Sequence, residues 1–149
     1  MLVIAGFDSC GKLPPGIHAA TWSQIIERLG STTRRKSLLN GLREALALLK
    51  RAGCRLVYLD GSFVTGKLEP GDFDACWGID GVDVERLDPV FLDFSNSRAR
   101  QKQRFGGEFF PAELPEGPTG KTFLEFFQTD KETGNAKGIL AIDLRRFRP

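Results

Sequence analysis

The spacing of apolar residues predicts two helices in the first third of the chain. A short helix should begin at Thr21 and end at Gly30, because Trp22 and three isoleucine or leucine side chains would share one face. Thr21 and Gln24 have the spacing of a capping box. A longer helix should run from Arg34 to Ala52, where leucine and alanine recur every three or four residues and would pack on a sheet.

Four cations lie outside the apolar stripe of the longer helix: Arg34, Arg35, Lys36 and Arg43. They form either a solvated face or a contact with nucleic acid, and we favour the solvated face. A third helix should begin at Asp88-Pro89, with the aspartate as N-cap, and continue toward Lys102. The basic segment 98–104 at its end either neutralises phosphates or meets the C-terminal helix dipole.

Short apolar runs predict the strands. A nearly continuous apolar run over Arg55–Leu59 is typical of a central strand, and further strands are expected at Asp72–Trp77, Glu108–Ala112 and Gly138–Leu144. Residues 1–20 should form an irregular lead-in with a short edge strand at Leu2–Phe7. The segment Thr122–Gln128 fits either a core strand or a short helix, and we expect the last strand to pair with the preceding segment as a hairpin.

These elements predict an α+β (α/β) fold, in which a mixed β-sheet packs against helices within one domain of 149 residues. The composition, 41% hydrophobic and 27% charged, is that of a globular protein. A net charge of +2 is too balanced to indicate nucleic-acid binding by itself. Because three cysteines cannot all pair and no apolar run reaches membrane-spanning length, we expect a cytoplasmic protein without a membrane segment.

The chemistry of the chain is concentrated in two neighbouring stretches, Val57–Phe63 and Pro70–Trp77. Asp72 and Asp74 are two residues apart at the start of a strand, so both carboxylates should point to the same side of the sheet. Their mutual repulsion calls for a compensating cation, and Mg²⁺ prefers such oxygen ligands. Gly61-Ser62 would let a phosphate approach the backbone. Alternatively, both stretches are ordinary turns, with Asp72 capping backbone N–H groups.

Gly61-Ser62 followed by Asp72-Phe73-Asp74 resembles the hG[GS]…Dh[DE]h signature of the nucleotidyltransferase superfamily, which has the polymerase-β-like fold. Four segments together resemble a family of small stand-alone bacterial proteins that is assigned to this superfamily and functionally uncharacterised: Leu13–His18, Tyr58–Phe63, Pro70–Asp74 and Gly107–Ala112. The resemblance implies a minimal nucleotidyltransferase-like fold.

The resemblance also implies roles for individual residues. Asp72 and Asp74 would be catalytic residues that hold two Mg²⁺ ions. Gly61 and Ser62 would bind the phosphates of a nucleoside triphosphate, with Lys67 adding positive charge. The superfamily usually has a third carboxylate on a neighbouring strand; Glu108 is the first candidate, Asp143 the second and Asp93 the third.

Other side chains have an ordinary structural interpretation beside a functional one. Phe63, Trp77 and Phe109 would either stack on a nucleobase or lie in the core, and we favour the core. His18, the single histidine, is either a general base or a structural hydrogen-bonding residue, and we favour the latter.

The reaction implied by the resemblance is transfer of a nucleoside monophosphate from a nucleoside triphosphate, such as ATP, to an RNA, protein or small-molecule acceptor. Small members often belong to toxin–antitoxin pairs, so the acceptor could be a tRNA or a partner protein. Because this short chain has no evident nucleotide-base or acceptor-binding domain, we expect a partner protein, an oligomer such as a homodimer, or a restricted substrate. The alternative is a catalytically inactive module of the same fold that binds a nucleotide or a partner.

Overall fold

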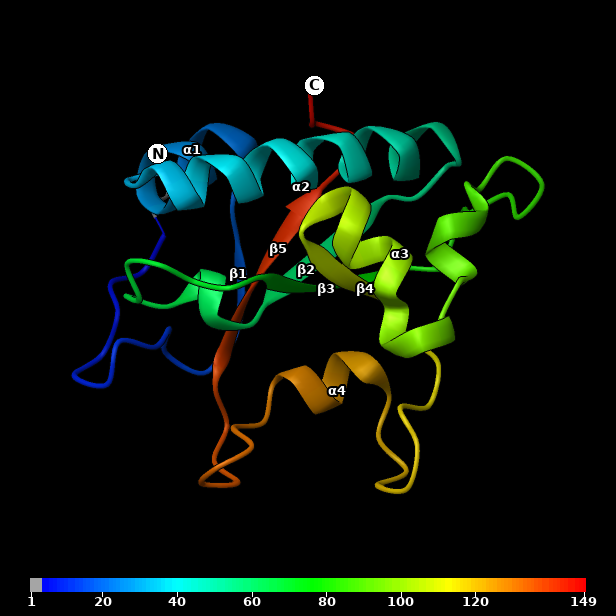
Figure 1. Ribbon diagram of the computed structural model, residues 1–149. Coiled ribbons are helices and arrows are strands. Elements are labelled where there is room, and N and C mark those ends of the chain that lie inside the picture. The colour runs from blue at the N-terminus through cyan, green and yellow to red at the C-terminus, as the bar shows by residue number, and fades with distance from the viewer. Residues whose placement is uncertain (1–3) are drawn as a thin grey trace.

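A five-stranded mixed β-sheet organises the chain in the computed structural model, which describes residues 4–149 (Figure 1). The strand order is β1-β5-β2-β3-β4. β2 is antiparallel to both of its neighbours, whereas β1 is parallel to β5 and β3 is parallel to β4. The strands are β1 (Gly16–Ala19), β2 (Leu56–Asp60), β3 (Phe73–Trp77), β4 (Gly107–Pro111) and β5 (Gly138–Asp143). The predicted α+β class is confirmed.

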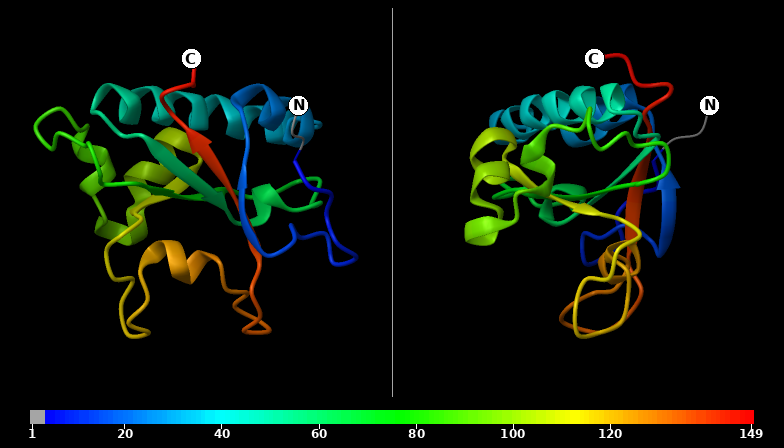
Figure 2. Two further views of the ribbon diagram at one scale, coloured as in Figure 1. Left: turned by 180° about the vertical axis from the view of Figure 1, so that it is seen from behind. Right: turned by 90° about the vertical axis from the view of Figure 1, so that its right-hand side faces the viewer.

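Four α-helices surround this sheet: α1 (Trp22–Leu29), α2 (Thr33–Arg51), α3 (Ser95–Phe105) and α4 (Phe123–Phe127). The views in Figure 2 show α1 and α2 on one side of the sheet and α4 on the other. Thr21 and Gln24 form the expected capping box, and Gly53 follows α2 with a φ of 97°. No helix within residues 4–149 is long and apolar enough to cross a lipid bilayer.

The two sheet faces carry different side chains because residues alternate along each strand. Phe73, Ala75 and Trp77 of β3 belong to the larger core, which also contains the buried leucines of α2. Cys76 lies on the opposite face and packs with Phe127 of α4 in a smaller cluster. Asp74 shares the face of Cys76, so the side of the sheet that α4 covers is the side that carries the carboxylates.

The three aromatic residues that would either stack on a nucleobase or lie in the core, Phe63, Trp77 and Phe109, belong to the larger core. Phe63 and Phe109 are fully buried and Trp77 is 4% exposed. Phe63 contacts the ring of Phe73, and Phe73 contacts that of Phe109, both edge to face. The core interpretation of these three residues is confirmed.

Two expectations about the sheet are wrong. Leu2 and Val3 of the expected edge strand lie outside the described residues, and residues 4–7 form no strand. The edge is instead β1, which pairs in parallel with β5. The last strand does not pair with residues 122–128 as a hairpin, because that segment forms α4, where Thr122 caps the helix and Glu125 completes a capping box.

The expected continuous helix from Asp88 to Lys102 is also interrupted. Asp88 accepts a hydrogen bond from the Val90 N–H and begins a 3₁₀ helix, η2 (Pro89–Leu92), as a capping aspartate should. The carboxylate of Asp93 then accepts bonds from the backbone N–H and hydroxyl of Ser95. This local turn competes with helix continuation, so α3 starts anew at Ser95.

Arg35 is not on a solvated face, which corrects the sequence interpretation for this residue. It is only 3% exposed, and its guanidinium lies over the Phe63 ring. The guanidinium donates hydrogen bonds to four backbone carbonyls: those of Leu29, Phe63, Thr65 and Lys67. Its neighbour Arg34 donates to the carbonyls of Pro70 and Gly71. Arg34 and Arg35, at the start of α2, therefore hold the loop between β2 and β3 by hydrogen bonds near both ends of that loop.

We expect Arg35→Met to lower the free energy of unfolding by about 2–4 kcal/mol, because it leaves buried carbonyl groups without donors. Urea unfolding followed by circular dichroism measures the change. The matched control is Lys36→Met, an exposed neighbour, which should change the free energy by less than about 0.5 kcal/mol. Equal effects of the two substitutions would contradict this role of Arg35.

Candidate functional site

Three carboxylates lie side by side across β2, β3 and β4. Asp60 is opposite Asp74 in the β2–β3 pair, and Asp74 is opposite Glu108 in the β3–β4 pair. Residues directly opposite each other on adjacent strands have Cβ atoms about 5 Å apart and share a face. Asp72, which directly precedes β3, adds a fourth acid near this row, and its charge acts on the carboxyl of Asp74.

Gly61 lies against this row, at the end of β2. It has a φ of 87°, and a Cβ atom at this position would lie 3.1 Å from both the backbone nitrogen and Oδ2 of Asp74. A side chain would therefore crowd the carboxylate and strain the backbone. Ser62 begins the 3₁₀ helix η1 (Ser62–Val64), and its hydroxyl donates to the Asp72 carbonyl at 3.5 Å. The structure thus brings together Gly61, Ser62, Asp72 and Asp74, as predicted.

The Asp74 carboxylate has no direct cationic partner within residues 4–149, although the charge of Lys131 lowers its pKa to some extent. Burial, and after it the charges of Asp72, Glu108 and Asp60 in that order of importance, together raise the pKa of its carboxyl to about 6. Burial and the charge of Glu108 also raise the pKa of Asp72. Within residues 4–149 neither carboxylate accepts a hydrogen bond or forms an ion pair.

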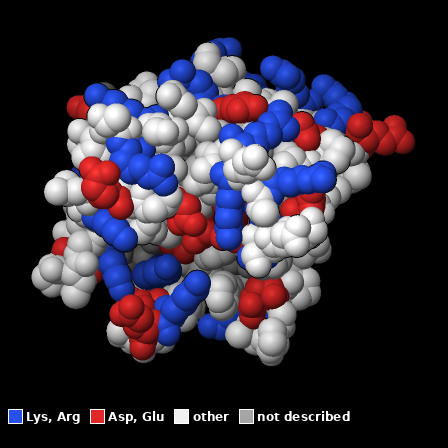
Figure 3. All heavy atoms as spheres, in the orientation of Figure 1, with Lys and Arg blue, Asp and Glu red and all other residues white. Residues whose placement is uncertain are grey.

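The outer two carboxylates of the row, in contrast, are paired with cations. Lys137 Nζ lies 3.1 Å from Oδ2 of Asp60, a residue that is only 4% exposed. Glu108 bonds Arg98 through Oε2 and lies 3.2 Å from Lys102 Nζ through Oε1. Acidic side chains accordingly lie in the middle of the face in Figure 3, among lysines and arginines. Asp74, at the centre of the row, therefore carries a negative charge with no ion-pair partner within residues 4–149.

The alternatives for the third carboxylate lie elsewhere. Asp143 ends β5 opposite Leu56, at the other end of β2 from Asp60, and pairs with Arg145. Asp93 lies outside the sheet, where it pairs with Arg100 at 3.5 Å. Of the three candidates, Glu108 alone is directly opposite Asp74.

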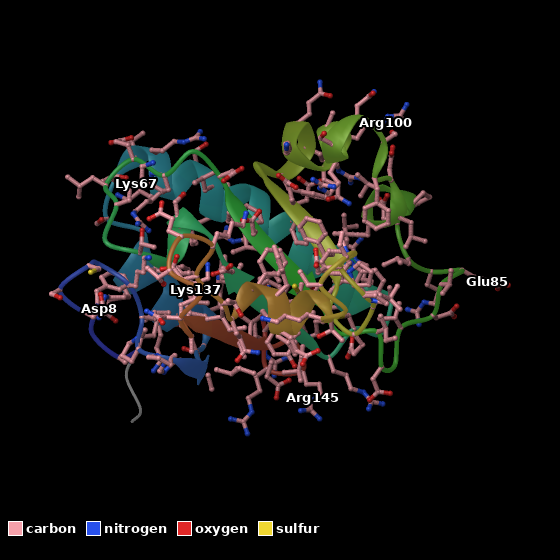
Figure 4. The ribbon with its side chains drawn as sticks, turned by 90° about the horizontal axis from the view of Figure 1, so that it is seen from below. Asp8, Lys67, Glu85, Arg100, Lys137 and Arg145 are labelled. Carbon is pink, nitrogen blue, oxygen red and sulfur yellow. The ribbon has the colours of Figure 1, made fainter. Side chains whose placement is uncertain are left out.

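Lys67 and His18 are not part of this cluster. Figure 4 shows Lys67 at the rim of the molecule and Lys137 near the middle. The cations whose charges act on the pKa of Asp72 are Lys102, Arg34 and Lys131, rather than Lys67. His18 lies on β1, with Nε2 2.7 Å from the Pro14 carbonyl oxygen, which is a structural contact.

Sequence reasoning missed Asp60 and Lys137, and it singled out the segment of Arg98 and Lys102 without predicting that they pair with Glu108. Asp60 directly precedes Gly61, and strand alternation could have placed it on the side of Asp74 once the antiparallel register was known. Arg98, Lys102 and Lys137 carry no comparable signal, because their pairing depends on how α3 and the segment before β5 fold back.

The donor chemistry of Asp72 and Asp74 fits a magnesium ion. Mg²⁺ is commonly bound by one or two carboxylates together with water and substrate phosphates. In the part of the chain that the structure describes, no group of three or more His, Cys, Asp and Glu side chains is arranged to hold a metal ion by itself. The fit is therefore to a metal that shares its coordination between this pair and a phosphate-bearing substrate.

We expect Asp74→Asn to raise the free energy of unfolding by about 1–2 kcal/mol at pH 7.5. The folded carboxyl has a pKa of about 6, against 3.8 as the ordinary value. Wild type therefore loses stability as pH rises through this interval, because the Asp74 carboxyl ionises. The asparagine variant has no ionising group at this position, so it keeps that part of the free energy of unfolding. Urea unfolding at pH 4 and pH 7.5 should show the advantage of the variant only at the higher pH.

Asp143→Asn is the control for this comparison. Arg145 lowers the pKa of the Asp143 carboxyl, so removal of this charge should give no gain in stability at pH 7.5. An Asp74→Asn variant that is less stable than wild type at pH 7.5 would contradict the uncompensated charge.

Residues 5–143 match the model of a family described as a family of unknown function (DUF6932). No curated protein and no solved structure matches the chain. The family match covers all five strands and every helix described above. The chain therefore belongs to this family of unknown function, DUF6932.

Proposed function

We propose that this protein is a Mg²⁺-dependent nucleotidyltransferase, which moves a nucleoside monophosphate from a nucleoside triphosphate to an acceptor hydroxyl. The observation that carries the proposal is the pair Asp72 and Asp74 beside Gly61-Ser62, whose carboxylates have no hydrogen-bond or ion-pair partner within residues 4–149, with Glu108 opposite Asp74. Two unpaired carboxylates next to a glycine that leaves room for a phosphate suit a metal–nucleotide complex.

Each residue would have a distinct task. Asp72 and Asp74 would hold Mg²⁺, which when bound would stabilise charge on the attacking and leaving oxygens. Gly61 would leave room for a phosphate beside Asp74. The Ser62 hydroxyl, now donated to the Asp72 carbonyl, would turn to a phosphate oxygen.

Glu108 would accept the proton of the acceptor hydroxyl. The acceptor oxygen would form a bond to the α-phosphorus, and the bond from that phosphorus to pyrophosphate would break. The charges of Lys131 and Lys102 already act on the pKa of Asp72. These two side chains would offset the negative charge that develops on pyrophosphate as it leaves. This assignment requires Glu108 to leave its ion pairs with Arg98 and Lys102.

Those same ion pairs favour a second candidate function, a non-catalytic module that binds a nucleotide or a partner. If Glu108 stays paired, the third carboxylate cannot accept a proton, although Asp72 and Asp74 could still bind a metal–nucleotide complex. Nucleotide binding is expected of both candidates, so turnover is the property that separates them.

The nature of the acceptor is a further part of the proposal. Every cation in the basic segment 98–104 forms an ion pair: Arg98 and Lys102 with Glu108, Arg100 with Asp93, and Arg104 with Glu44 and Asp88. This favours a structural role of that segment over RNA-backbone binding. We therefore propose that a partner protein or a second copy of the chain presents the acceptor. The acceptor is a tRNA, a protein or a small molecule in the cytoplasm. Membership of a toxin–antitoxin pair stays a prediction.

Incubation with each α-labelled nucleoside triphosphate, Mg²⁺ and either bulk tRNA or cell lysate tests the proposed reaction. Wild type should transfer label from at least one nucleotide to one acceptor pool. The Asp72→Asn/Asp74→Asn variant should lose at least about 100-fold of this rate, because both metal ligands are removed.

Asp143→Asn provides the control, since it removes a carboxylate at the opposite end of β2. It should retain transfer close to that of wild type. If wild type moves no label with any nucleotide in either pool, the binding module becomes the better interpretation. Equal transfer by wild type and the double variant would rule out Asp72 and Asp74 as the catalytic pair.

A further inference from the structure

Arg98 and Lys102 occupy both carboxylate oxygens of Glu108. The Arg98 guanidinium bonds Oε2 and lies 4.9 Å from the centre of the Phe110 ring, while Lys102 approaches Oε1. The side chain of Glu108 is only 14% exposed, so little water competes with these contacts. In this structure the carboxylate opposite Asp74 is thus withheld from any ion bound at Asp74.

The backbone that carries Arg98 is strained. Asn96, Ser97 and Arg98 have φ angles of 51°, 55° and 62°, which places three successive residues with side chains in the left-handed region. Single residues of this kind are uncommon, and runs are rarer because each Cβ crowds the following carbonyl. Such strain persists where surrounding contacts impose it, and it concentrates at functional sites.

Fixed contacts lie on both sides of the strained segment. Before it, Asp93 accepts hydrogen bonds from Ser95. After it, the buried side chain of Gln101 donates to the Val90 carbonyl and accepts from the Phe109 N–H, which anchors α3 to η2 and β4. Arg98 is therefore the side chain through which the strained segment itself contacts the site.

We infer that Arg98 is a positioning residue that withholds Glu108 and releases it when a divalent cation binds at Asp72 and Asp74. The inference rests on the proposed function, because it assigns the regulation of that same site. A cation at Asp74 attracts the carboxylate opposite it and competes with Arg98 for Glu108. Release would let residues 96–98 adopt right-handed backbone, and the relieved strain would offset part of the lost ion pair.

Two substitutions should change cation affinity in opposite directions. Arg98→Gln removes the charge that holds Oε2 of Glu108, so this oxygen becomes available while Lys102 stays at Oε1, and the cation binds more tightly. Ser97→Gly removes strain from the withheld form, because glycine adopts left-handed backbone readily, so that form gains stability and the cation binds more weakly. A merely structural role of residues 96–98 predicts no such opposition.

Titration of the full chain with Mn²⁺, with the free ion followed by electron paramagnetic resonance, measures this affinity without any turnover. Arg98→Gln should bind Mn²⁺ about five- to tenfold more tightly than wild type, a coupling of ordinary size for linked sites. Ser97→Gly should bind about two- to fivefold more weakly. Arg98→Lys, which keeps the charge, should lie close to wild type. Far-UV circular dichroism checks that each variant is folded.

The controls separate action through Glu108 from general electrostatics. Arg100→Gln removes a charge from the same helix, but Arg100 pairs with Asp93 and lies at the rim in Figure 4, so affinity should stay unchanged. In a Glu108→Gln background, Arg98→Gln should no longer tighten binding. If the gain persists in that background, Arg98 acts by simple repulsion and the inference is overturned.

The remaining outcomes are also distinct. Wild type that binds Mn²⁺ with the same affinity as Arg98→Gln and Ser97→Gly overturns the positioning role but leaves the proposed function intact. Wild type that binds no Mn²⁺, or binds it equally well after Asp72→Asn/Asp74→Asn, removes the metal site and with it the proposed function.

Discussion

The constraint on which the site depends is the repulsion among carboxylates that neighbouring strands hold side by side. Asp60, Asp74 and Glu108 occupy one row, and each outer member has a cation of its own. Asp74, in the middle, has none within residues 4–149, and Asp72 adds further negative charge beside it. The fold thus concentrates its open charge at one position, next to the glycine that leaves space for a ligand.

The hydrophobic core enforces this arrangement through strand register. Phe73 and Ala75 flank Asp74 in sequence and point into the core, so a slip by one residue would bury the carboxylate among apolar side chains. At the start of β4, a Cβ on Gly107 would lie 2.5 Å from the Phe73 ring, so only glycine permits this close approach of the two strands. Glu108 follows directly and is held opposite Asp74. Packing on one face therefore fixes the electrostatics of the other.

Local sequence patterns predicted the elements nearest the site with boundaries within one or two residues. The apolar periodicity of α2, the runs of β2, β3 and β4, and the spacing of Asp72 and Asp74 are all local features. The rest depends on contacts between distant segments: β1 pairs with β5, and Lys137 reaches back to Asp60. Arg35 could not be recognised as buried, because its burial is stabilised by carbonyl groups of a loop that packs there only after folding.

The difference in pairing among the four acids also bears on what the site is for. A carboxylate that serves only structure lowers its free energy by gaining a donor, as Asp60 does from Lys137. Asp72 and Asp74 instead stay half-buried and unpaired, which destabilises the folded chain. A cation that binds only the folded form would offset that cost by mass action. Stability and ligand binding are then coupled through the same two side chains, so a ligand of this pair must be positively charged or carry a metal.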